Sequence, residues 1–324
     1  MPESTPAIHY RNLGPSGLRV STSGLGCNNF GRAGTATETQ EGTTEVINAA
    51  IDAGVTFFDT ADIYGRDCGL SETLMGVSLD GKRDGIILAT KFGMDMQGAN
   101  GPEWGARGSR RYIRIAVESS LRRLQTDWID LYQLHEPDPH TPIDETLAAL
   151  DELVADGKIR YYGHSNLAGW QIAEAELTAR LERHPRFISA QNEYSLLSRG
   201  VEADVLPAVR QFGLGFLPYF PLYNGILSGK YTRDGGPEGA RVTTEKRYLL
   251  ERANWDAVEK FQEFCDRRGV SMLEATFGWL LAQPNLASVI AGATTPDQVR
   301  QNAAAATAWV PDVAALADID AIFA

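Results

Sequence analysis

Cysteine is scarce in this chain of 324 residues. The three cysteines, Cys27, Cys68 and Cys265, form an odd set, and no Cys-x-x-Cys pair occurs. This pattern predicts no disulfide framework and is typical of a reducing compartment, so we expect a cytoplasmic protein. Whether Cys27 or Cys68 is redox-active stays open, and inert thiols are the favoured interpretation because no activating base is identifiable.

Long apolar runs and a surplus of basic residues are also lacking. No run approaches the roughly 18–20 apolar residues that cross a bilayer. Residues 1–10 lack the basic-then-apolar order of a signal peptide, so we expect no membrane partner. Lys+Arg number 30 against 42 Asp+Glu, a formal net charge of −12. Such a chain repels phosphate backbones, which argues against nucleic-acid binding, and an anionic cofactor would need local basic groups and backbone N–H donors.

Strand-like and helix-like segments alternate along the chain. Apolar, β-branched or aromatic runs occur at 22–26, 55–59, 86–90, 128–134, 159–163, 187–191, 213–219 and 286–291. Helix-like segments lie between most of them, including 109–125, 141–157, 168–183, 254–268, 271–282 and 296–308. Ser109 and Thr141 are the expected N-caps of the first two. The order predicts one α/β domain over 1–324, a (β/α)8 TIM barrel.

Additions to the barrel are expected at three places. The Gly-Pro-Ser-Gly sequence within 10–21 predicts an N-terminal β-hairpin that closes the bottom of the barrel. The interval 219–286 is too long for one crossover and predicts an extra loop and helix. The segment 312–323 predicts an extra C-terminal helix. A doubly wound sheet is the main alternative, but Gly24, Gly26 and Gly31 lack the spacing of its phosphate-binding turn.

Polar residues follow the predicted strands at the point where each one ends. Asp59, Lys91 and His135 each close an apolar run, and Tyr64 follows Asp59 by five residues. Because the carboxyl ends of parallel barrel strands share one face, these groups are expected to converge there. A carbonyl that accepts hydride needs a proton donor, and Tyr64 is the expected donor. We expect Lys91 to lower the pKa of Tyr64 and Asp59 to hold Lys91 in place. His135 would orient the carbonyl oxygen.

Other interpretations of these residues stay open. Asp59 and Lys91 alone would also suit a buried ion pair, and Tyr64 or His135 alone would suit a structural role. His135 and His140 do not predict a metal site, because no third ligand with sensible spacing is present.

Seven segments together resemble the aldo-keto reductase family. They are FFDTADIYG (57–65), ATKFG (89–93), DLYQLH (130–135), DELVADGKIRYYGHSNL (151–167), QNEYSLL (191–197), PYFPLYNGILSGKY (218–231) and IAGATTPDQVRQN (290–302). The resemblance implies a TIM-barrel oxidoreductase that uses NADP(H), with Asp59, Tyr64, Lys91 and His135 as its catalytic tetrad and Tyr64 as general acid.

The same resemblance implies a cofactor site. Ser165, Asn166 and Gln191 would bind the nicotinamide carboxamide, and Tyr219 would stack on the ring. The implied phosphate-side residues are Pro221, Leu222, Gly225 and Leu227 in a loop along the pyrophosphate, and Gly292, Thr294, Gln298 and Asn302 at the adenosine phosphate. Many family members have a lysine or arginine where this chain has Gly292 and Gln298. Lys230 and Arg241 would then supply the charge, as in the branch that resembles potassium-channel β subunits. Phe220 stands where serine is frequent.

The expected reaction is NADP(H)-dependent reduction of a small aldehyde or ketone. Phe30, Phe92, Trp104 and Tyr223 are the predicted walls of the substrate pocket. Two alternatives remain: an NADP(H)-binding sensor or regulatory subunit with slow turnover, and a lyase in which Lys91 forms a Schiff base. The physiological substrate, the choice of NADP over NAD and the oligomeric state are not readable from the sequence.

Overall fold

The computed structural model describes residues 8–324, apart from the side chain of Arg241. Most of the segment 1–10, which carries no predicted signal peptide, therefore lies outside the described residues. Eight strands form one parallel sheet in the order β10-β3-β4-β5-β6-β7-β8-β9. Their bounds are β3 Ser23–Gly26, β4 Phe57–Asp59, β5 Ile87–Phe92, β6 Ile129–Leu134, β7 Ile159–Ser165, β8 Ser189–Glu193, β9 Gly215–Tyr219 and β10 Val289–Gly292.

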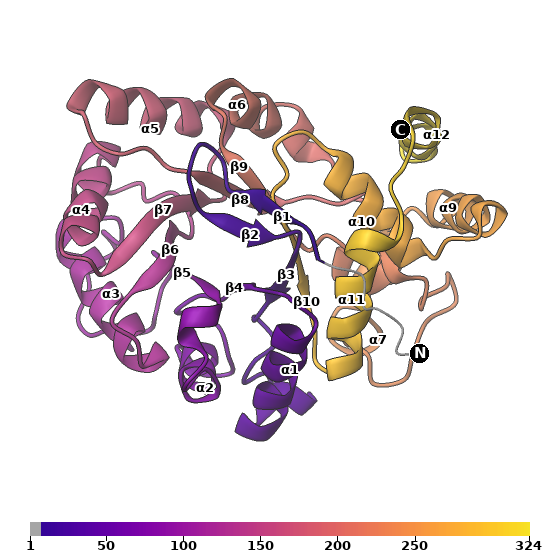
Figure 1. Cartoon of the computed structure of the whole chain (residues 1–324), viewed down its shortest axis with the longest axis horizontal. Coiled ribbons are helices and arrows are strands. Elements are labelled where there is room, and N and C mark those ends of the chain that lie inside the picture. Colours follow the sequence, from indigo (N-terminus) through magenta and orange to yellow (C-terminus); the bar gives the residue numbers. More distant parts are fainter. Residues whose placement is uncertain (1–7) are drawn as a thin grey trace.

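The sheet curls until its two outer strands, β9 and β10, approach each other (Figure 1). The backbone of Phe216 in β9 bonds to the segment before β10, accepting from Ala287 N at 3.0 Å and donating to Asn285 O at 2.8 Å. With helices around the outside, this arrangement is a (β/α)8 barrel, and the predicted fold class is confirmed.

The helices that follow the strands cover the outside of the barrel. They are α1 Gln40–Asp52, α2 Leu70–Ser78, α3 Arg110–Leu124, α4 Ile143–Ala155, α5 Gly169–Glu182, α6 Val205–Phe212, α10 Met272–Ala282 and α11 Pro296–Ala308. Ser109 caps α3 as predicted, because its side chain accepts from Tyr112 N. The Thr141 cap is wrong: α4 starts at Ile143 without a side-chain cap, and the Thr141 hydroxyl donates to Asp138 instead.

The predicted hairpin consists of β1 Tyr10–Asn12 and β2 Arg19–Ser21 and lies across the barrel in Figure 1. Its turn approaches the amino ends of the strands so closely that a Cβ at Gly14 would lie 2.6 Å from Gly215 N. Leu13, Leu18 and Val20 are buried with inward-facing strand residues in one apolar cluster. The hairpin therefore closes the bottom of the barrel.

The long interval between β9 and β10 holds more than one helix. It contains the short helices η4 Tyr223–Ser228, α7 Arg241–Thr244 and α8 Tyr248–Arg252, the longer α9 Trp255–Arg268, and then α10. The C-terminal helix α12 Val313–Ile322 lies at the edge of the molecule, where Phe323 contacts the ring of Phe261 in α9. Both predicted additions are present.

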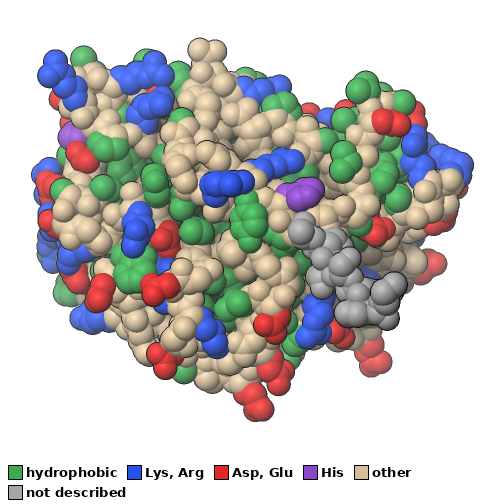
Figure 2. Space-filling view, in the orientation of Figure 1, with side chains coloured by type: hydrophobic (Ala, Val, Ile, Leu, Met, Phe, Trp, Pro, Cys, Tyr) green, Lys and Arg blue, Asp and Glu red, His purple; other side chains and the backbone are tan. Residues whose placement is uncertain are grey.

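The surface seen from the hairpin side carries basic and acidic side chains with apolar side chains between them (Figure 2). Within residues 8–324, no helix combines the length and the apolar character that crossing a bilayer requires.

Candidate active site

Alternation along the strands places the candidate groups inside the barrel mouth. Side chains two residues apart on a strand share a face. Phe57, Ala89, Leu131 and Leu217 belong to the inner apolar cluster that also contains the hairpin residues. The residues two positions later on the same strands are Asp59, Lys91, Gln133 and Tyr219. Each strand thus ends its inner face in a polar side chain, one layer above the apolar filling.

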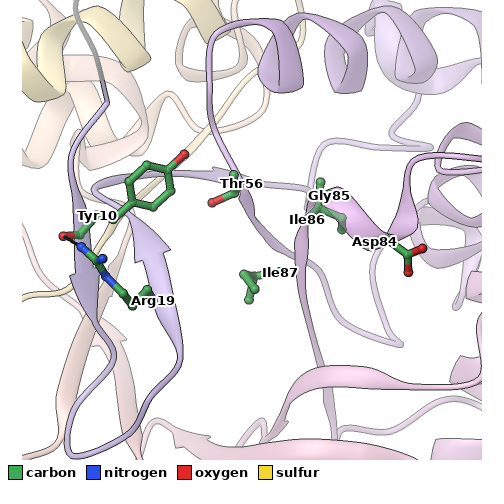
Figure 3. Close-up of a pocket in the computed structure, with 7 residues that line it drawn as sticks. All are labelled: Tyr10, Arg19, Thr56, Asp84, Gly85, Ile86 and Ile87. Atoms are coloured by element: carbon green, nitrogen blue, oxygen red, sulfur yellow. Dashed lines mark hydrogen bonds between the residues drawn. The ribbon is translucent and has the colours of Figure 1, made fainter.

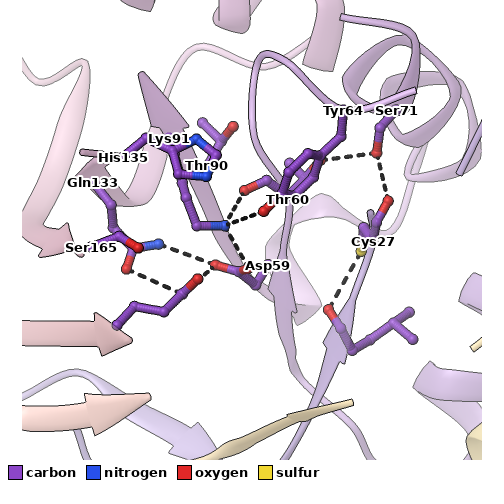
Figure 4. Close-up of polar contacts among 12 residues, drawn as sticks. Cys27, Asp59, Thr60, Tyr64, Ser71, Thr90, Lys91, Gln133, His135 and Ser165 are labelled. Atoms are coloured by element: carbon purple, nitrogen blue, oxygen red, sulfur yellow. Dashed lines mark hydrogen bonds and ion pairs between the residues drawn. The ribbon is translucent and has the colours of Figure 1, made fainter. Parts of the chain in front are cut away.

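Lys91 is the centre of this polar layer (Figure 4). Its ammonium nitrogen lies 2.6 Å from Asp59 Oδ2, 2.8 Å from the carbonyl oxygen of Thr60 and 3.5 Å from the Tyr64 hydroxyl. Lys91 is fully buried and Asp59 nearly so. Burial alone would lower the pKa of Lys91, but the Asp59 charge and the contact with Tyr64 outweigh it and raise that pKa overall. Lys91 is therefore an ammonium whose three N–H bonds all have acceptors.

The second carboxylate oxygen of Asp59 also has partners. Gln133 Nε2 lies 3.1 Å from Asp59 Oδ1, and Gln191 Nε2 lies 3.0 Å from the same oxygen. The sequence reasoning missed Gln133. An amide two residues after Leu131 in the strand Ile129–Leu134, and so in phase with its inner face, is the signal that could have found it.

Tyr64 and His135 face each other edge-on above Lys91, with ring centroids 5.7 Å apart. Burial raises the pKa of Tyr64, and the Lys91 charge offsets this only in part, so the net shift is opposite to the lowering expected from Lys91 alone. Tyr64 is therefore a protonated phenol at neutral pH. Burial and the Lys91 charge hold the pKa of His135 well below its ordinary value, so the imidazole is neutral.

Three of the four residues predicted to surround nicotinamide form a chain of contacts beside His135. The Tyr219 hydroxyl donates to Asn166 Oδ1 at 2.9 Å, and Asn166 Nδ2 donates to the His135 carbonyl at 3.0 Å and the Ser165 hydroxyl at 3.1 Å. Asn166 has a φ of 61°, a left-handed conformation that asparagine tolerates. The fourth residue, Gln191, contacts Asp59, so all four lie around the quartet of Asp59, Tyr64, Lys91 and His135.

The loop after β9 bends sharply. Phe220, Tyr223 and Asn224 have positive φ, which is uncommon for residues other than glycine. The N–H groups of Gly225 and Leu227 both donate to the carbonyl of Leu222. Pro221 and Leu227 are buried, and Leu222 is half-buried. The N–H groups of Gly225 and Leu227 are thus already used inside the loop.

Lys230 lies against this loop. A Cβ at Gly225 would be 3.2 Å from Lys230 Cε, so the lysine side chain passes directly over the glycine. Burial lowers the pKa of Lys230, and no ion pair is present for it within the described residues. An anion beside Lys230 would favour the charged ammonium and raise that pKa again. The predicted partner Arg241 begins α7, but its side chain lies outside the described part of the structure.

The segment after β10 forms the start of α11, as the sequence predicts. Thr295 caps the helix, and Gln298 Oε1 accepts from Thr294 N at 2.8 Å. A Cβ at Gly292 would lie 2.8 Å from Asn29 Nδ2, so this glycine permits close approach of the loop after β3. Asn302 is buried one turn further along the helix.

The predicted aromatic walls of the substrate pocket are not brought together. Phe92 points outward from the barrel and stacks on Tyr132 with ring centroids 4.6 Å apart. Phe30 is also fully buried, so in this structure neither ring presents surface to a ligand. Trp104 is exposed, with the Arg111 guanidinium carbon 4.3 Å from its ring centroid. Tyr223 is half-buried in the loop after β9.

A cavity of about 620 Å³ lies at the loop that carries Tyr64, although Tyr64 itself does not line it. It lies between Ile63, Gly65–Cys68 of the loop after β4 and Met96–Ala99 of the loop after β5. Cys68 lines it, while Cys27 is fully buried and burial raises the pKa of its thiol. None of the four predicted aromatic residues lines this cavity.

A second cavity of about 310 Å³ lies near the bottom of the barrel (Figure 3). Tyr10 and Arg19 of the hairpin face Thr56, Asp84 and the start of β5 across it. None of the predicted site residues lines it, and it is separated from the quartet by the inner apolar cluster.

Comparisons with known proteins agree with this architecture. A family model described as the Aldo/keto reductase family matches residues 24–323. A Bacillus subtilis protein named "Uncharacterized oxidoreductase YrpG" is 38% identical over 300 residues, which cover 90% of this chain and 89% of that protein.

Two further relatives carry more specific names. A rice protein named "Probable voltage-gated potassium channel subunit beta" is 34% identical and covers 91% of this chain and 90% of its own length. The "L-glyceraldehyde 3-phosphate reductase" of Escherichia coli K12 is 32% identical and covers 98% of this chain and 93% of its own length.

Proposed function

The chain belongs to the aldo/keto reductase family, and we propose that it is an NADP(H)-dependent reductase of small aldehydes or ketones. The observation that carries the proposal is the hydrogen-bonded line from Asp59 through Lys91 to Tyr64 at the barrel mouth. When bound, the nicotinamide cofactor would supply the hydride that the carbonyl carbon accepts. Tyr64 donates its hydroxyl proton to the carbonyl oxygen as negative charge develops there.

Each remaining member of the quartet has a separate task in this proposal. Lys91, charged and fixed by Asp59, stabilises the phenolate that Tyr64 becomes when it gives up its proton. Neutral His135 can donate a hydrogen bond to the carbonyl oxygen without competing as a strong acid. A charged Lys91 is not a nucleophile, which argues against the Schiff-base lyase.

The residues of the rim fit a nicotinamide nucleotide. Ser165, Asn166 and Gln191 offer amide and hydroxyl groups beside the ring of Tyr219, which suits binding of the carboxamide. Lys230 is exposed beside the loop after β9 and suits a phosphate because an anion would pair with it. The N-terminus of α11, with Gly292, Thr294, Gln298 and Asn302, suits a further phosphate. Arg241, Pro221, Leu222, Gly225 and Leu227 complete the proposed cofactor contacts.

The substrate is proposed to approach Tyr64 from the cavity lined by its sequence neighbours Ile63 and Gly65–Cys68 and by Met96–Ala99. Arg66 and Asp67 at this cavity make part of its lining polar, so oxygenated small carbonyl compounds are a better match than long apolar ones. We place the enzyme in the cytoplasm because the chain has few cysteines and no paired spacing among them.

NADPH and NADH titrations followed by intrinsic fluorescence test the cofactor, and a panel of aldehydes and ketones tests turnover. We expect tighter binding of NADPH than of NADH and measurable oxidation of NADPH with at least one carbonyl compound. Lys230→Met should lower NADPH affinity about tenfold and leave NADH affinity unchanged, whereas Lys260→Met, at an exposed position on α9, should change neither.

Equal affinity of the wild type for both nucleotides would remove the NADP assignment. Tight NADPH binding without turnover on any carbonyl compound would favour a sensor or regulatory subunit, the role that the name of the rice relative suggests for that protein.

A further inference from the structure

Gln133 is a fully buried amide in the middle of the candidate site. It lies on β6 directly beside Lys91 of β5, to which it is paired in the strand register. Figure 4 shows its side chain pointing to Asp59 from the side opposite Tyr64. Buried amides are costly unless they are hydrogen-bonded, and among the described residues Gln133 forms its hydrogen bonds with Asp59 and Gln191.

The contacts of Asp59 show what the amide does. One oxygen, Oδ2, accepts from Lys91, and the other, Oδ1, accepts from Gln133 and Gln191. The carboxylate is therefore fixed from both ends. Lys91 reaches only one of its oxygens, and its remaining N–H bonds point to Thr60 O and the Tyr64 hydroxyl.

We propose that Gln133 is a positioning residue for the proposed reduction. It holds the Asp59 carboxylate in the orientation in which Lys91 also contacts the Tyr64 hydroxyl. The proposal rests on the reductase function given above. Without an amide donor on Oδ1, the buried carboxylate satisfies both oxygens by turning toward the ammonium. Lys91 then moves away from the Tyr64 hydroxyl, to which its contact is already the longest of the three at 3.5 Å.

Gln191 does not make Gln133 redundant. In the proposed function Gln191 also binds the nicotinamide carboxamide, so its amide group is shared between Asp59 and the carboxamide when the cofactor is bound. Gln133 has no such second task, because it is not among the residues proposed to bind the nicotinamide and its hydrogen bonds are to Asp59 and Gln191. Its contribution is thus expected in the cofactor-bound enzyme, on the chemical step and not on cofactor affinity.

Gln133→Leu and Gln133→Glu test the proposal in the full-length enzyme. Gln133→Leu keeps the size but removes the donor, and we expect kcat to fall about tenfold with the NADPH Kd unchanged within about twofold. A neutral glutamic acid at 133 can donate its O–H to Asp59, whereas an ionised glutamate adds a second negative charge beside it. Gln133→Glu should therefore regain activity as the pH is lowered, a pH limb that the wild type and Gln133→Leu lack.

Gln211→Leu and Gln211→Glu are the matched controls, because Gln211 is exposed on α6 and away from the barrel mouth. Both should keep the kcat, the Kd and the pH profile of the wild type. A wild-type kcat in Gln133→Leu, or a wild-type pH profile in Gln133→Glu, would overturn the proposal. If Gln133→Leu does not fold, the pH profile of Gln133→Glu decides alone. Failure of the reductase function is separate, because it would appear as absent turnover in the wild type.

Discussion

The ammonium of Lys91 and the carboxylate of Asp59 lie 2.6 Å apart inside the barrel mouth, with side-chain exposures of 0% and 5%. Removing either charge alone leaves the other buried without its partner. In such pairs the loss of one member is more damaging than the loss of both. We therefore expect substitution of either residue to affect both turnover and the free energy of unfolding.

Lys91→Met should abolish turnover and also destabilise the protein. The expected loss is about 3–5 kcal/mol in the free energy of unfolding, because Asp59 stays buried as an unpaired carboxylate. Urea unfolding followed by circular dichroism measures this.

The double variant Lys91→Met/Asp59→Asn separates stability from chemistry. It should regain most of the lost stability, since no buried charge remains, and stay inactive. A double variant no more stable than Lys91→Met would show that the packing of the lysine stem, and not the unpaired charge, explains the loss.

Tyr64→Phe should leave the fold and the NADPH affinity intact, because the ring keeps its edge-on contact with His135. Loss of the hydroxyl removes the proposed proton donor, and kcat should fall about 10²-fold or more. Steady-state kinetics together with a fluorescence titration of NADPH checks both parts. A near-normal kcat would refute Tyr64 as the general acid.

The sequence predicts the fold well because strand and helix signals alternate regularly. The run expected at 213–219 corresponds to β9, Gly215–Tyr219, and the helix expected at 296–308 is observed with these bounds. Polar strand ends are harder to predict. The strand expected at 187–191 continues to Glu193, because at the barrel mouth a polar residue can extend the hydrogen-bonded ladder as well as an apolar one can.

The candidate site is predictable only where the residue type itself indicates chemistry. Asp59, Lys91 and His135 stand out as charged or titratable groups that end apolar runs. Gln133 does not, since its role depends on which neighbour its amide reaches across the barrel. The sequence predicts Phe92 at the pocket because it is aromatic. The alternation of side chains along β5 turns it to the outer face instead.

The buried side chain of His164 is expected to make the free energy of unfolding depend on pH. It is fully buried against Phe187, neither ring nitrogen has a hydrogen-bond partner within residues 8–324, and burial lowers its pKa to about 3. The unfolded chain takes up the proton near pH 6.5, so the stability is fully present above that pH and is lost as the pH falls toward 3. Between pH 7 and 4 this loss is on the order of 3 kcal/mol.

His164→Leu removes this contribution. Its free energy of unfolding should fall less steeply from pH 7 to 4 than that of the wild type, while His140→Leu at an exposed site should match the wild type. Urea denaturation at a series of pH values measures the slopes. Equal slopes in wild type and His164→Leu would mean that the folded protein accommodates the protonated ring.

Gly76 in α2 packs directly against the backbone at the end of α3. A Cβ at this position would lie 2.8 Å from the carbonyl carbon of Leu124 and 3.0 Å from its Cα, both backbone atoms at the end of α3. Alanine is intrinsically better than glycine in a helix by about 1 kcal/mol. Backbone cannot yield as a flexible side chain does, so we expect Gly76→Ala to lower the free energy of unfolding by about 1–3 kcal/mol despite that gain.

Gly85→Ala is the control for Gly76→Ala, because a Cβ at Gly85 would meet nothing within 4 Å. This variant should keep the stability of the wild type within about 0.5 kcal/mol. Thermal and urea unfolding of the two variants beside the wild type make the comparison. A Gly76→Ala variant as stable as Gly85→Ala would show that α2 and α3 can separate without cost, and that the glycine is not what sets their distance.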